Sequence, residues 1–166
     1  MAEKKEYRLK TLLQLRERKK EEAERYLGEC MKALREEQQR LRDMEEELER
    51  MIANREARAR EYAEKAMRGE MSAQAAVAAN LYIERLKEQE EMQQNAIEGQ
   101  KAVVAQRQDE VDGARQDLIV ANQEMKALEK HREKWEEQIK KEQMAKEEDM
   151  LDEIAQSGFL RNQRGS

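Results

Sequence analysis

The sequence contains no proline among its 166 residues. An average protein of this length would carry roughly eight, at about 5% of all residues. Proline breaks the interior of a helix, because it removes a backbone donor and its ring clashes with the preceding turn. Its absence therefore permits very long uninterrupted helices.

Aromatic side chains are also scarce, at 4% of residues, whereas charged residues make up 43%. Large apolar side chains supply most of the energy of a core, so this composition excludes a thick globular core. Two classes remain: a disordered chain, or extended helices held together along a narrow apolar stripe, here called the seam. Charges of opposite sign alternate at short range, which favours the helices.

Reactive and metal-binding residues are few. Cys30 is the single cysteine and His131 the single histidine, so the chain offers neither an intramolecular disulfide nor a Cys/His zinc set. We interpret Cys30 as a small, partly buried hydrophobe and His131 as a residue on the surface or beside the seam. The segment 69–72 lacks the lysine and the preceding strand of a phosphate-binding loop. We therefore predict that the protein is not an enzyme and binds no cofactor or metal.

Long apolar runs are absent. The longest extends only from Ala75 to Ala79, far short of the ~20 residues that span a bilayer. The first residues are charged, so we expect no secretory signal. The net charge of −5 disfavours binding to nucleic acid. These features predict a cytoplasmic protein without direct membrane insertion.

Apolar residues instead recur every seven positions, the spacing of a coiled coil. The first half repeats leucine and adds methionine three residues later, at Leu27, Leu34, Leu41, Leu48, Met44 and Met51. Arg55 interrupts this frame, and Tyr62 resumes it. The second half has its own set, at Ile97, Val104, Val111, Leu118 and Met125, with Ala114, Ala121, Leu128 and Trp135 three residues further on.

A break between the two seams lies near the middle of the chain. Gly69 follows Lys65 and Arg68, which is typical of a helix end, and the Ser72 hydroxyl can cap the next helix. The pattern predicts a first helix over 1–68, a turn over 69–72, a second helix over 73–155 and a disordered tail over 156–166. The fold class is all-α: a long antiparallel two-helix coiled-coil hairpin, which we expect to be monomeric.

The two ends of this hairpin differ in charge. Residues 1–20 carry eight Lys/Arg against three Glu, whereas residues 142–153 carry six Asp/Glu against one Lys. The second helix is the longer one. We therefore expect its acidic end either to project past the N-terminus or to lie against the first basic turns.

Three stretches resemble the FliJ family of type III export systems, which comprises the flagellar stalk protein and its injectisome counterparts. The first runs from Tyr7-Arg8-Leu9 through Leu12-Leu13 and Leu15-Arg16 to Ala23 and Leu27-Gly28-Glu29. The others are Leu81-Tyr82-Ile83-Glu84-Arg85-Leu86 and Asp152-Glu153-Ile154-Ala155. Their order and spacing carry the resemblance, and the last stretch favours a flagellar member, although the injectisome alternative stays open.

The resemblance implies a function. Family members are similar to the central stalk of rotary ATPases: the open end of the hairpin inserts into the hexameric export ATPase ring, promotes its assembly and couples ATP hydrolysis to export. Another surface contacts the cytoplasmic domain of the export gate, and members also bind export chaperones. The resemblance thus places the protein in the cytoplasm, peripherally at the base of the export apparatus.

The resemblance also suggests candidate residues. For the ATPase ring they are Arg8, Lys10, Leu12, Leu15, Arg16, Arg18, Asp149, Met150, Leu151, Asp152, Glu153 and Ile154. For the export gate they are Met44, Met51, Tyr82 and Leu86. Packing in the seam or plain helix surface is the competing interpretation at each position.

Two other functions remain open. A structural spacer would pair two chains in a parallel coiled coil, which the break at Gly69 disfavours. A chaperone-like coiled-coil adaptor would need β-strands at its base, and no alternating apolar pattern predicts them.

Overall fold

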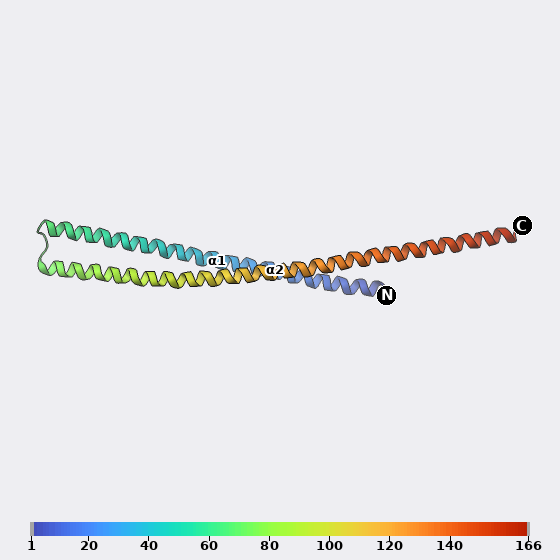
Figure 1. The fold of residues 1–166 in the computed structure, drawn as a ribbon, viewed down its shortest axis with the longest axis horizontal. Helices are drawn as coiled ribbons and strands as arrows, with labels where there is room; N and C mark the ends of the chain where they lie inside the picture. The colour runs from blue at the N-terminus through green and yellow to red at the C-terminus, as the bar shows by residue number, and fades with distance from the viewer. Residues whose placement is uncertain (1, 166) are drawn as a thin grey trace. The chain divides into compact units, whose positions relative to one another are not determined.

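The computed structural model describes residues 2–165, with side chains from Leu9 onwards. It consists of two long helices, α1 (Ala2–Met67) and α2 (Ala73–Arg164), joined by a short turn (Figure 1). No strand occurs in this range. The predicted fold class, an all-α two-helix hairpin, is confirmed.

The turn between the helices is fixed by two capping arrangements. Gly69 has a φ of 69°, in the left-handed region that glycine enters without a Cβ clash. Its N–H donates to the carbonyl of Ala66 (3.1 Å), and the N–H of Glu70 donates to that of Lys65 (3.0 Å), the two bonds of a Schellman motif. On the other side, the Ser72 hydroxyl accepts from the N–H of Ala75 at 3.1 Å and caps α2.

The C-terminal end of α2 differs from the sequence prediction. We expected disorder over 156–166, but α2 continues through Gly158 to Arg164. A single glycine costs a helix only about 1 kcal/mol relative to alanine, and no proline follows to stop it. Gly158 alone is therefore too weak a signal to end the helix.

The contacts of the chain divide it into two compact units. The hairpin unit comprises residues 24–116 and includes the turn. The terminal unit comprises residues 1–23 together with residues 117–166.

The core of the hairpin unit is a narrow apolar seam. Cys30, Leu34, Val111 and Ala114 are buried against one another, and Leu27, Met31 and Val104 pack on them. Ile97 and Val111 are the most deeply buried large side chains among the described residues, at 2% and 0% exposed. The heptad residues of the two halves thus meet as the sequence pattern indicates.

The terminal unit has a thinner seam. Its α2 residues on the heptad frame are only half-buried, namely Leu118, Met125, Leu128, Trp135 and Ile139. Every residue from 140 to 165 is exposed. No helix in the part of the chain that the structure describes is long and apolar enough to cross a membrane.

Replacing Ile97 with alanine should lower the free energy of unfolding by about 2–5 kcal/mol, because it removes buried methyl groups and leaves a cavity. Urea denaturation followed by circular dichroism measures this change. Leu81→Ala is the matched control: Leu81 lies on the same helix but is exposed, so its loss should cost no more than about 0.5 kcal/mol. Equal losses for the two variants would contradict the assignment of the seam as the core.

Candidate partner-binding surfaces

The N-terminal candidates for ATPase contact lie on α1 in the terminal unit. Lys10, Leu12, Leu15 and Arg18 are exposed, so basic and apolar side chains face solvent together on this part of α1. Arg8 lies within the helix, but its side chain falls outside the described residues.

Arg16 differs from these neighbours because it already has a partner. Its guanidinium is half-buried and forms an ion pair with the Glu124 carboxylate on α2. A ring-lining residue would have to compete with Glu124 for this guanidinium. The structure therefore favours Arg16 as a contact that holds the two segments of the terminal unit together.

The C-terminal candidates lie on one exposed stretch of α2. Met150, Leu151 and Ile154 are 62%, 66% and 64% exposed, although they are large and apolar. Asp149, Asp152 and Glu153 are exposed among them. This stretch thus presents an apolar surface interrupted by carboxylates to solvent.

The two sets of ATPase candidates are not brought together. Arg16 pairs with Glu124, and the acidic set begins at Asp149, 25 residues later on the same helix. That separation is about 37 Å along α2 at 1.5 Å per residue. Figure 1 shows this part of α2 beyond the N-terminal end of α1. Of the two arrangements that we expected, the acidic end projects.

Two further exposed apolar residues on α2 were missed by the sequence interpretation. Phe159 and Leu160 are both exposed and, with Ala155 and Gln156, line a shallow open hollow on the helix. Phe159 lies four residues after Ala155 and eight after Leu151, a helical spacing that could have identified it. The expected disorder after Ala155 hid this signal.

The export-gate candidates lie in the hairpin unit and are mostly part of its seam. Met44, Met51 and Leu86 are half-buried, whereas Tyr82 is exposed. Other exposed apolar side chains near the turn are Met67, Val77 and Leu81. Of the four candidates, Tyr82 therefore offers the most accessible surface to a partner.

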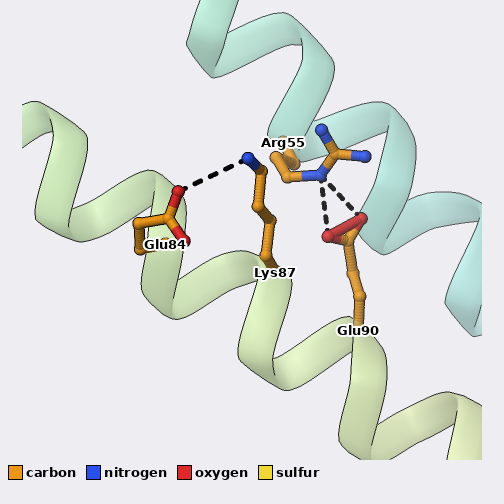
Figure 2. A network of polar contacts seen from close by, with 4 residues as sticks. All are labelled: Arg55, Glu84, Lys87 and Glu90. Carbon is orange, nitrogen blue, oxygen red and sulfur yellow. Dashed lines mark hydrogen bonds and ion pairs between the residues drawn. The ribbon is translucent and has the colours of Figure 1, made fainter.

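An ion pair interrupts the seam of the hairpin unit. Arg55 Nε on α1 donates to both carboxylate oxygens of Glu90 on α2, at 2.9 and 2.7 Å (Figure 2). Glu90 is 9% exposed, while nearby Lys87 pairs with Glu84 on the solvent side of α2 at 3.4 Å. The hydrogen bond to Glu90 raises the pKa of Arg55, so the guanidinium stays charged at any pH at which the protein would be studied.

Glu90 was not predicted to be a seam residue. Arg55 lies on the leucine frame of the first half, and Glu90 lies seven residues before Ile97 on the frame of the second half. The two interruptions therefore occupy matching positions of their seams. Counting the frame back from Ile97 would have found Glu90, but glutamate is so frequent in this chain that the position does not stand out.

Two glutamines form further polar contacts between the helices. Gln93 Nε2 donates to the main-chain carbonyl of Met44 at 3.0 Å, and Gln100 Nε2 donates to that of Glu37 at 3.0 Å. The Glu37 carboxylate also accepts from Gln100. These contacts are one heptad apart, so the same arrangement recurs along the hairpin unit.

The residues that could bind a metal or react are scattered in the described range. No group of three or more His, Cys, Asp or Glu side chains there could hold a metal ion. His131 is exposed and Cys30 is buried with its thiol free.

Comparison with known proteins identifies relatives. The profile of the YscO-like protein family matches residues 4–165. A solved structure of a YscO homologue, CT670 from Chlamydia trachomatis, has a TM-score of 0.83 and 22% sequence identity, and the match covers 95% of this chain and 97% of that one. At this identity the likeness shows a shared fold. No curated protein sequence matches the chain significantly.

Reversing the acidic charges of the exposed stretch should leave the fold intact. We expect Asp149→Lys, Asp152→Lys and Glu153→Lys each to change the free energy of unfolding by no more than about 0.5 kcal/mol, because these side chains are exposed. Thermal denaturation of the triple variant checks this. A large loss of stability would mean that the acidic side chains hold the fold together and are not free for a partner.

Proposed function

The chain belongs to the YscO-like family, and from that premise we propose that it serves as the coiled-coil stalk of a type III protein export apparatus. Through its terminal unit it inserts into the hexameric export ATPase ring and promotes the assembly and activity of the ring. Through its hairpin unit it contacts the cytoplasmic domain of the export gate, and export chaperones are further partners. It acts in the cytoplasm at the base of the apparatus.

Family membership itself confirms the resemblance to FliJ-like proteins. The protein is a coiled-coil protein associated with type III secretion, in a family of structural rather than catalytic proteins. The flagellar assignment that Asp152-Glu153-Ile154-Ala155 favours stays a prediction.

One observation supports the ATPase role above the others: the exposed C-terminal stretch of α2. It is helical, it has no cover from α1, and it exposes Met150, Leu151 and Ile154 to about two thirds of their surface. Apolar side chains gathered on an exposed surface mark sites of interaction with other molecules. A helix that presents such side chains on one face binds into a groove of its partner.

The charge pattern is compatible with a ring as that partner. The exposed carboxylates of Asp149, Asp152 and Glu153 would steer the helix toward basic side chains of a pore. The apolar side chains between them would supply the affinity once water is expelled. On α1, exposed Lys10 and Arg18 offer the opposite charge to a different part of the ring.

The structure disfavours the two alternative functions. A parallel spacer would pair two chains, whereas the seam of the hairpin unit is formed between α1 and α2 of one chain. A chaperone arm would need β-strands at its base, and the structure contains no strand between residues 2 and 165. The spacer and the adaptor are therefore not proposed for this chain.

Deletion of residues 140–166 should abolish stimulation of the cognate export ATPase and assembly of its hexamer, because it removes the exposed stretch. Steady-state ATP hydrolysis and gel filtration of the purified ATPase with and without the protein measure both effects. Full stimulation by the truncated chain would contradict the proposed role of this end.

A finer variant should separate the apolar contacts from the length of the helix. Met150→Ala/Leu151→Ala/Ile154→Ala should weaken binding to the ATPase by at least about tenfold, because a loss of only 1.4 kcal/mol has that effect. Gln156→Ala/Ser157→Ala is the matched control, since it alters polar residues on the same exposed stretch. Isothermal calorimetry with the ATPase measures both affinities, and equal affinities would exclude an apolar contact by this stretch.

A further inference from the structure

The Arg55–Glu90 pair occupies a position where the rest of the seam is apolar. Leu34 packs with Val111 in the core cluster, and both residues lie on the same frames as Arg55 and Glu90. The side chains of Arg55 and Glu90 are only 25% and 11% exposed. A partly buried ion pair contributes little net stability, because withdrawing the charges from water offsets their attraction. Stability alone therefore does not explain the pair.

A heptad seam has an ambiguity that such a pair can resolve. Because apolar residues repeat every seven positions, one helix can slide by seven residues and still place apolar side chains opposite apolar side chains. In one such displaced pairing, Leu41 would lie opposite Val111 and Leu48 opposite Val104. Packing of the seam alone discriminates poorly between the two pairings.

On the frame of Leu34 and Val111, the ion pair is where the two pairings differ. Beside that frame, the displaced pairing would also bring Glu37 to the place of Cys30 opposite Ala114, a difference that the displaced reporter described below removes. In the displaced pairing Arg55 would lie opposite Ile97 and Glu90 opposite Tyr62, so both charges would lose their partner inside the seam. An unpaired charge in such a place is strongly disfavoured. The contacts of Gln93 and Gln100 with main-chain carbonyls do not discriminate in this way, because every residue of α1 offers such a carbonyl. The displaced pairing would separate Gln100 from the Glu37 carboxylate, but it would leave a main-chain carbonyl for the Gln100 amide.

We propose that the Arg55–Glu90 pair is a register lock: it restricts α1 and α2 of the hairpin unit to one pairing, against a competing pairing displaced by one heptad. The inference concerns the purified chain and does not depend on the proposed function. The turn at Gly69 and Ser72 is the rival determinant of register, since displacement would move it into the alanine-rich residues 73–79. The two determinants can be separated by experiment.

Disulfide formation reports each pairing. The native reporter is Ala114→Cys with the natural Cys30, because both positions lie in the same buried cluster. The displaced reporter is Cys30→Ala/Glu37→Cys/Ala114→Cys, because Glu37 lies one heptad from Cys30 and would replace it opposite position 114. A disulfide requires Cβ atoms roughly 3.5–4.5 Å apart, so neither reporter closes in the other pairing. Equilibration in glutathione buffer and mass spectrometry of the monomer give the fraction closed.

The test compares an apolar replacement of the pair with a reversal of its charges, each in both reporter backgrounds. With Arg55→Leu/Glu90→Leu, the closed fraction of the displaced reporter should rise at least about tenfold, because no unpaired charge then disfavours that pairing. The melting temperature of the Arg55→Leu/Glu90→Leu variant should not fall, because leucine packs well in an apolar seam. With Arg55→Glu/Glu90→Arg, the pair is kept in reverse, and the native reporter should remain the one that closes.

An unchanged closed fraction of the displaced reporter in Arg55→Leu/Glu90→Leu would overturn the proposal, because the register would then be set without this pair. The charge-reversed variant is an independent test of whether the pairing of the charges sets the register, because it alters both residues yet retains an ion pair. If it closes the displaced reporter as readily as the leucine variant does, the pairing of the charges is not the cause.

Discussion

The structure depends on an apolar seam about one side chain wide. With 43% charged and 4% aromatic residues, the chain has no other apolar surface large enough to hold its helices together. Complete burial is confined to a few positions, such as Ile97 and Val111, each at the seam. The stability of the fold is therefore spread thinly along the helices, and each layer of the seam depends on its immediate neighbours.

This constraint explains why polar contacts matter here more for arrangement than for strength. In a globular core, many apolar neighbours of different shape fix a side chain in one place. In a repetitive seam those neighbours recur every heptad, so shape carries little information about position. Arg55 and Glu90, and on the terminal unit Arg16 and Glu124, are contacts that distinguish one layer from the next.

Much of the fold could be predicted from particular residues. The leucines at 27, 34, 41 and 48 predict the seam, and Gly69 with Ser72 predicts the turn, because each follows from local chemistry. The partners across the seam could not be predicted, since Arg16 and Glu124 are 108 residues apart and a periodic pattern allows several registers. The helix through Gly158 was missed because a glycine followed by polar residues looks the same at a helix end and within a helix.

The candidate surfaces also include features that the sequence predicts and features that it does not. Exposure of Met150, Leu151 and Ile154 follows from the greater length of α2, which the position of the turn already implies. The half-burial of Met44 and Met51 follows from their places on the heptad frame, whereas that of Leu86 could not be predicted, because leucine occurs both in the seam and on the surface.

The uncovered end of α2 has a thermodynamic consequence. A helix with no tertiary contact is held only by its own hydrogen bonds and side-chain pairs, and such helices are marginal in water. Amide protection should therefore fall along α2, from residues near Ile97 and Val111 to little protection after residue 140. A partner that binds this end would have to offset the conformational entropy that the segment loses when it is held helical. Part of the contact energy would therefore go into ordering the helix, and the complex would dissociate readily.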